Sequence, residues 1–220
     1  ALLRPLPYPE SERIVDIRHH GPGLGMPELA SSPGLILRYR QHAKTLGAVA
    51  GYRTRSLNLA DGGTPERVRT LAMTPDLLTV LATPPAIGRP FTDADAQTHA
   101  PRVAILTHGL WQARFGGDPG VIGRTVRLDG HPAEIVGIMP SGFRFPDTET
   151  RLIVPLQLDP DSGFGAFGLT SLARLAPGVY DLAVFARSTI SNTFNNVQLV
   201  RVTVEAPPSN PRMWVDYPSN

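Results

Sequence analysis

The chain has 220 residues, of which 41% are hydrophobic and 18% are charged, and its formal net charge is +2. This length suits one large domain or a domain with an appendage, and the apolar content is sufficient for a packed core. Because the chain contains no cysteine, disulfides, thiolate metal sites and cysteine catalysis are excluded. No segment has the roughly 20 apolar residues of a membrane span. The opening residues, ALLRPLPYPE, lack the basic start and apolar core of a signal peptide.

Arginine supplies nearly all of the positive charge, since lysine is almost absent. A nucleic-acid surface requires basic residues clustered along one face. Acidic and apolar residues interrupt Arg53, Arg55, Arg67 and Arg69. The arginines therefore indicate solvated surface, and no nucleic-acid partner is predicted.

Two helices of the first half are predicted to begin in the same way. Ser32–Pro33 and Thr74–Pro75 each place a capping hydroxyl before a proline at the first helical position. Asp61-Gly62-Gly63 is typical of a hairpin turn between two strands. In chain order we predict a strand over residues 13–18, a Gly/Pro loop to residue 27, a helix over 33–44, strands over 48–52, 56–60 and 67–73, and a short helix over 76–81.

Residues 102–146, RVAILTHGLWQARFGGDPGVIGRTVRLDGHPAEIVGIMPSGFRFP, form the most informative run of the chain. Asp129-Gly130 between two alternating segments is a strong type I′ hairpin signal. We predict strands over residues 103–106, 124–128 and 133–139, a helix over 108–115 and a tight turn over 116–120. Further strands are predicted over 152–156 and 172–175, and an amphipathic hairpin is predicted from strands 179–187 and 197–204. The fold class is therefore α+β: short antiparallel strands and hairpins with a few short helices, plus a C-terminal β-hairpin.

Several motifs resemble functional sites but lack the context that such sites need. Gly163-x-Gly165-x-x-Gly168 has no strand directly before it and no convincing helix after it, so it is interpreted as a flexible loop and not as a dinucleotide site. Asp93-x-Asp95 begins like a calcium loop, but Thr98 and Ala104 stand where that loop needs Gly and Glu. A surface turn capped by Thr92 is predicted there instead.

The remaining polar candidates are also interpreted as structural. Thr107-His108 are neighbours in sequence and not a catalytic dyad, and Thr107 is predicted to cap a helix. Trp111 and Phe115 are expected to form the buried face of that helix. The six histidines lack metal-ligand spacing; they are His19, His20, His42, His99, His108 and His131. No catalytic, cofactor-binding or metal-binding residue is predicted, no cofactor is expected, and the chain is not predicted to be an enzyme.

The run over residues 102–146 resembles the periplasmic core domain of MacB-type ABC-transporter permeases. Other pieces similar to that family occur in order: LLRPLPYPE at the start, LNLADGGTPERVRTLAMTPDLLTVLATPPAIGRPFTDAD, and SLARLAPGV. The resemblance covers about residues 1–179. It implies an extracytoplasmic domain at the periplasmic face of the inner membrane that couples membrane-helix movement to export. The implied partners are the permease membrane helices, an ABC ATPase subunit, periplasmic adaptor proteins and a second copy in a homodimer.

The C-terminal hairpin departs from this pattern. It resembles the last two strands of a secreted immunoglobulin-like sandwich, with Gly178-x-Tyr180-x-Leu182 similar to a tyrosine corner. We therefore expect a core domain over residues 1–178, a hairpin appendage over 179–206 and a linker or tail over 207–220. A secreted adhesion or carbohydrate-binding β-module is one alternative. A non-functional truncated or fused permease fragment is another, and a hydrolase is the weakest.

Overall fold

The computed structural model describes residues 6–21, 26–158, 167–187, 194–204 and 213–215, and only the backbone of 20–21, 26–28 and the segments beyond 178. The helices are α1 (Pro33–His42), α2 (Leu77–Val80), α3 (His108–Phe115) and the 3-10 turns η1 (Ser11–Arg13), η3 (Asp93–Ala96) and η4 (Pro119–Val121). The strands are β1 (Ile14–Ile17), β2 (His19–Gly21), β3 (Met26–Leu29), β4 (Leu46–Ala60), β5 (Glu66–Met73), β6 (Ile87–Gly88), β7 (Val103–Leu106), β8 (Thr125–Leu128), β9 (His131–Ile138), β10 (Leu152–Pro155), β11 (Thr170–Leu175), β12 (Gly178–Arg187), β13 (Phe194–Val204) and β14 (Met213–Val215).

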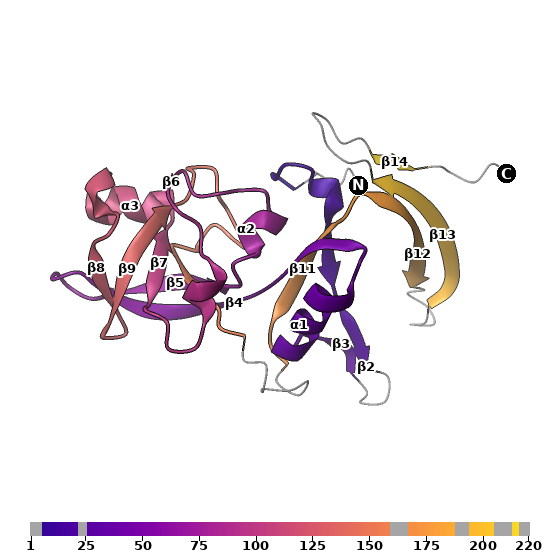
Figure 1. The fold of residues 1–220 in the computed structure, drawn as a ribbon, viewed down its shortest axis with the longest axis horizontal. Helices are drawn as coiled ribbons and strands as arrows, with labels where there is room; N and C mark the ends of the chain where they lie inside the picture. The colour runs from indigo at the N-terminus through magenta and orange to yellow at the C-terminus, as the bar shows by residue number, and fades with distance from the viewer. Residues whose placement is uncertain (1–5, 22–25, 159–166, 188–193, 205–212, 216–220) are drawn as a thin grey trace.

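One mixed sheet organises the molecule (Figure 1). Its nine strands follow the order β1-β11-β4-β5-β10-β7-β9-β6, and β8 pairs with both β4 and β9. The predicted antiparallel hairpins β4–β5 and β8–β9 are present. Two parallel pairs, β5–β10 and β7–β9, were not predicted. The α+β class inferred from the sequence is confirmed.

The sheet has a hydrophobic core on each face. One core contains Ile36 of α1 and Leu110 of α3, whereas the other contains Leu77 and Val80 of α2. All four residues of β7 are buried, with alternate residues in alternate cores. A strand buried on both faces is continuously apolar and not amphipathic, and this explains the sequence VAIL.

Capping residues place the two longer helices as the sequence predicts. The Ser32 hydroxyl accepts a hydrogen bond from the backbone N–H of Leu35 at 3.3 Å, and the Thr107 hydroxyl accepts one from the N–H of Leu110 at 3.4 Å. Each hydroxyl satisfies a donor that the first helical turn leaves free. Gly116 ends α3 with a φ of 63°, a left-handed conformation that favours glycine. The helix predicted over 33–44 ends at His42.

Thr74 was predicted to cap α2, but its side chain forms no capping hydrogen bond. Its hydroxyl accepts a hydrogen bond from the backbone N–H of Gly51 at 3.1 Å, and its own N–H donates to the Gly51 carbonyl at 2.9 Å. Thr74 therefore ties the end of β5 to β4, and α2 is a single turn from Leu77 to Val80. The Thr74 side chain binds the Gly51 backbone, a tertiary contact that the local sequence does not indicate.

A single strand, β4, replaces the two strands predicted over residues 48–52 and 56–60. Its 15 residues pair with β11 at one end and with β5 and β8 at the other. In Figure 1 it runs between the part that contains α1 and the part that contains α3. The polar segment from Arg53 to Ser56 suggested a break, but it is exposed strand. The loop predicted up to residue 27 also differs, because β2 pairs with β3 there.

The predicted C-terminal hairpin is present in the backbone. β12 and β13 pair antiparallel, with Tyr180 opposite Val202, and β14 adds a third strand. These strands form a sheet separate from the nine-stranded one. The side chain of Tyr180 and most of the linker or tail predicted over residues 207–220 lie outside the described residues.

Deleting residues 180–220 should leave the nine-stranded sheet folded, because its described strands do not pair with β12, β13 or β14. We expect the guanidinium midpoint of the truncated chain to match that of the full chain, and self-association to fall because an exposed strand edge is lost. Chemical denaturation and sedimentation velocity measure the two effects. A cooperative transition at much lower denaturant would place the hairpin inside the core domain.

Candidate functional site

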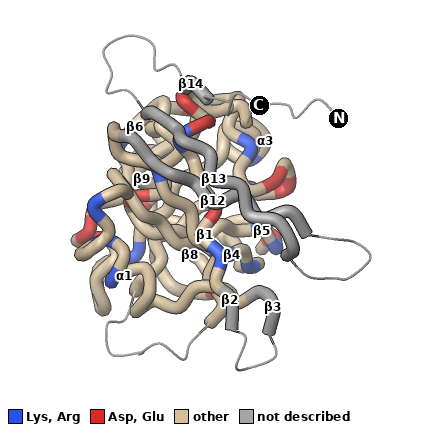
Figure 2. The backbone as a smooth tube through the Cα atoms, turned by 90° about the vertical axis from the view of Figure 1, so that its right-hand side faces the viewer, with Lys and Arg blue, Asp and Glu red and all other residues tan. Residues whose placement is uncertain are grey.

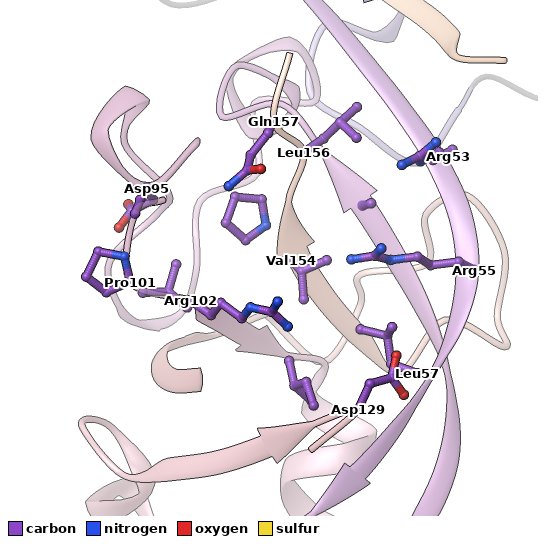
Figure 3. Close-up of a pocket in the computed structure, with 15 residues that line it drawn as sticks. Arg53, Arg55, Leu57, Asp95, Pro101, Arg102, Asp129, Val154, Leu156 and Gln157 are labelled. Atoms are coloured by element: carbon purple, nitrogen blue, oxygen red, sulfur yellow. The ribbon is translucent and has the colours of Figure 1, made fainter. Parts of the chain in front are cut away.

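A pocket of about 320 Å³ lies on one face of the sheet. Residues of β4, β5 and β10 and the segment before β7 line it (Figure 3). Its floor is apolar and consists of Leu57, Ala72, Val154 and Leu156, all of which are buried. Register explains this floor, since Val154 of β10 lies beside Ala72 of β5 in the sheet and directly paired residues share a face. The pocket is therefore a stretch of sheet that neither α1 nor α3 covers.

Three arginines line this apolar floor. Arg53 and Arg55 alternate with Leu57 on the same face of β4, and Arg102 immediately precedes β7. In Figure 3 the side chains of Arg55 and Arg102 extend into the pocket from opposite sides. Within the part of the chain that the structure describes, none of the three forms an ion pair.

The electrostatics of Arg55 reflect this arrangement. Partial desolvation of the otherwise exposed Arg55 side chain lowers its pKa, and the positive charges of Arg53 and Arg102 lower it further, whereas Asp129 opposes the shift. The three arginines therefore repel one another, and each disfavours the charged state of its neighbours. A bound anion would relieve this repulsion.

The two acidic residues at the pocket are held by other partners. Asp95 accepts hydrogen bonds from both terminal nitrogens of Arg89, at 2.7 and 3.0 Å. One Asp129 oxygen accepts from the backbone N–H and the side-chain amide of Asn58, at 2.8 and 3.0 Å. Both carboxylates therefore have fixed structural roles, and the pocket retains an excess of positive charge.

Asp95 should make stability depend on pH. Hydrogen bonds from Arg89 lower its pKa from 3.8 to about 2, although burial opposes the shift. Because the folded-state pKa is depressed, the stabilisation is fully present above about pH 4 and is lost as pH falls toward 2. We expect Asp95→Asn to destabilise the protein by roughly 1–2 kcal/mol at pH 7 and to flatten the acid limb of the stability curve. Urea denaturation between pH 2 and 7 measures both. An acid limb identical to that of the wild type would contradict this assignment.

A second cluster binds the N-terminal segment to the rest of the fold. The guanidinium of Arg174, on β11, donates to the Pro9 carbonyl at 3.0 Å, to the Glu10 carboxylate at 3.1 Å and to the Val80 carbonyl at 2.9 Å. Arg13 donates to Glu10 at 2.6 Å and to the Leu175 carbonyl at 2.7 Å. We call Glu10, Arg13 and Arg174 the N-terminal clamp.

The clamp is desolvated and locally strained. Arg13 and Arg174 are only 7% and 8% exposed, and burial lowers the pKa of Arg174. Glu10 has a φ of 50°, a left-handed conformation that is costly for a residue with a side chain. The two arginines hold Glu10 in this conformation. Sequence reasoning missed the clamp because its members lie at opposite ends of the chain.

A third network fixes α3 on the tip of the β4–β5 hairpin. Arg114 binds Asp61 through two nitrogens, at 2.7 and 3.2 Å, and reaches Glu66 at 3.1 Å. Glu66 also pairs with Arg151. Such two-pronged contacts between a guanidinium and a carboxylate give geometric specificity, so this cluster has a structural role.

The predicted aromatic face of α3 is only partly buried. Trp111 and Phe115 pack against the core at its edge, while the fully buried residue of this helix is Leu110. The Trp111 indole donates to the Asp118 carbonyl at 2.9 Å, which closes the predicted turn after the helix. Sequence spacing identified the correct helix face but not how much of it the core covers.

The other motifs take structural positions where they are described. Thr92 and Asp95 form a reciprocal capping box at η3, as predicted. Thr107 caps α3, and His108 stacks edge-on against Trp111. Among the histidines, His19 is stacked on Tyr39. In the described residues, no group of three or more His, Asp or Glu could hold a metal ion. Most of the glycine motif beginning at Gly163 lies outside the described residues.

Comparisons with known proteins agree with this fold. The sequence model of the MacB-like periplasmic core domain matches residues 7–210, a range that includes β12 and β13. A search of curated proteins gives no significant match. Among the helices of the described residues, none has the length and hydropathy needed to cross a membrane.

Three solved structures share the fold at low sequence identity. The periplasmic region of MacB from Actinobacillus actinomycetemcomitans has 14% identity and a TM-score of 0.56, covering 74% of both chains. The extracellular domain of the noncanonic ABC-type transporter YknZ from Gram-positive bacteria has 16% identity and a TM-score of 0.53, covering 74% of this chain and 83% of that one. A permease-protein domain from Porphyromonas gingivalis has 17% identity and a TM-score of 0.58, covering 79% and 80%. With the match over residues 7–210, the chain belongs to the MacB-like periplasmic core domain family of ABC-transporter permeases.

Proposed function

We propose that the chain is a non-catalytic extracytoplasmic domain that couples movement of permease membrane helices to export. The observation that carries this proposal is the N-terminal clamp. Through Arg174, the segment at Pro9 and Glu10 is bound to β11 and to the end of α2. A displacement of the segment at Pro9 and Glu10 would be passed to β11 and then to the central sheet, since β11 pairs with β4.

The architecture favours transmission of movement by a stiff body. The same strand, β4, contacts β11 at one end and β5 and β8 at the other. Pairing with β5 along the exposed middle of β4 and close packing around its buried residues support transmission of a force from β11 to the far hairpin. The proposed partners are the permease membrane helices, an ABC ATPase subunit and periplasmic adaptor proteins, with a homodimer as the proposed assembly at the periplasmic face of the inner membrane.

Site-directed labelling tests the proposed location. Because these 220 residues contain no cysteine, Ser56→Cys introduces the single thiol of this domain at an exposed position of β4. In intact cells that express the membrane protein containing this domain, a membrane-impermeant maleimide should label this thiol as completely as it does after lysis. Labelling that appears only after lysis would contradict an extracytoplasmic position. The same membrane protein with Ser56 retained is the control, and its labelling measures any thiol outside these 220 residues.

A further inference from the structure

We infer that the arginine pocket on β4 binds a small amphiphilic anion, with a carboxylate or phosphate-ester head on a short apolar body. This inference is independent of the proposed coupling role, because it rests on the pocket and not on the clamp. Three features of the pocket carry it: its apolar floor, its size, and three arginines that form no ion pair with any described residue.

The floor selects an apolar body. Leu57, Ala72, Val154 and Leu156 line the cavity with apolar side chains that are at most 7% exposed. Covering this surface removes apolar area from water, which favours binding by about 25 cal/mol for each Å². A volume of about 320 Å³ lies at the lower end of the range for small-molecule sites. The occupant is therefore a short chain or a single ring.

The arginines select a negative head group. The side chains of Arg55 and Arg102 reach into the cavity from opposite sides (Figure 3), where a single head group can contact both. A guanidinium presents planar N–H groups that match the oxygens of a carboxylate or phosphate. The Gln157 amide is less available, since its nitrogen already donates to the Gln97 carbonyl at 2.9 Å.

The distribution of charge argues against a nucleic acid as the occupant. Arg67 and Arg69 pair in register with Asn58 and Ser56, which alternate with the pocket-facing residues of β4 and so lie on the opposite face. Arg69 is also bound to Asp147 at 2.7 Å. In Figure 2 basic and acidic segments are interspersed and form no continuous basic stripe. Arg53, Arg55 and Arg102 instead place positive charge around a concave pocket, as a small ligand requires.

Calorimetric titration of the full 220-residue chain with four probes tests this inference. Hexanoate and hexyl phosphate combine a charged head with an apolar body, whereas hexan-1-ol lacks the charge and inorganic phosphate lacks the body. We expect at least one amphiphilic anion to bind with a Kd on the order of 1 mM or tighter, and both partial probes to bind at least tenfold more weakly. Whichever amphiphile binds more tightly identifies the head group.

Three variants locate the binding in the pocket. Arg55→Gln and Arg102→Gln should each weaken binding about tenfold or more. Arg67→Gln removes the same charge from the opposite face and should leave the Kd within about twofold of the wild-type value. Circular dichroism establishes that each variant is folded. Saturation by neither amphiphile, equal binding of hexan-1-ol, or an equal loss in Arg67→Gln would each overturn the inference.

Discussion

Replacing Arg174 with methionine is expected to destabilise the protein by roughly 3–5 kcal/mol, the usual cost of removing one partner from a buried ion pair. Methionine fills similar space but donates no hydrogen bond. The Pro9 and Val80 carbonyls then lose their contacts with Arg174, and Glu10 retains only Arg13 of its two cationic partners. Guanidinium denaturation measures the change in the free energy of unfolding.

Two further variants separate charge loss from loss of the clamp. Arg124 is well exposed, and its contact with Asp118 is long at 4.0 Å, so Arg124→Met should cost at most about 1 kcal/mol. Because Glu10 and Arg174 interact directly, the double variant Glu10→Met/Arg174→Met should be less destabilised than the sum of the single variants. A cost below about 1 kcal/mol for Arg174→Met would show that the clamp is not a stabilising contact.

Replacing Gly88 with alanine is expected to destabilise the protein by roughly 3 kcal/mol or more, as steric overlap adds to backbone strain. Gly88 has a φ of 81°, and an added Cβ would lie 2.2 Å from the Val136 carbonyl oxygen and 2.9 Å from the Gly137 Cα. Both are backbone atoms of the paired strand β9, so a side-chain rotation cannot relieve the overlap. Thermal unfolding should show a correspondingly lower Tm.

Gly123 provides the matched control for this substitution. Its φ is 83°, almost the same as that of Gly88, but an added Cβ would meet no atom within 4 Å. Gly123→Ala should therefore cost only about 1–2 kcal/mol from strain. Equal losses in the two variants would show that strain alone accounts for the Gly88 effect and that β6 can move away from β9.

Local chemistry in the sequence was sufficient to predict several elements. Asp129 and Gly130 adopt φ values of 49° and 80°, as the type I′ turn between β8 and β9 requires. Ser32 and Thr107 cap α1 and α3 because a hydroxyl before a helix can satisfy a free N–H of the first turn. Motifs of this kind depend only on neighbouring residues, and the family resemblance rested on their order along the chain.

Long-range pairing could not be predicted from the same signals. The parallel pairs β5–β10 and β7–β9 join segments that no hairpin connects. The Thr74 hydroxyl serves Gly51, although the local sequence indicated a helix cap. The clamp residues Glu10 and Arg174 meet only because β1 pairs with β11. Each of these contacts depends on the whole fold.

The clearest local disagreement coincides with the arginine pocket. Arg53 and Arg55 interrupt the apolar alternation of β4, so the sequence predicted two strands where one exists. The strand continues because hydrogen bonds to β5 pair Arg53 with Ala72 and Arg55 with Thr70. Polar residues on a core-facing surface are expected where the sheet is uncovered, and departures from local sequence rules often mark functional positions.

Substrate-stimulated ATP hydrolysis by the reconstituted permease and its ATPase most directly tests coupling through the N-terminal clamp. Arg174→Met should keep basal hydrolysis but reduce stimulation by transported substrate on the order of tenfold. Leu110→Ala, which opens the core at a fully buried residue of α3 and should cost about 2–5 kcal/mol of stability, should retain stimulation at temperatures where the domain is folded. Full stimulation in Arg174→Met, or an equal loss in Leu110→Ala, would contradict coupling through the clamp.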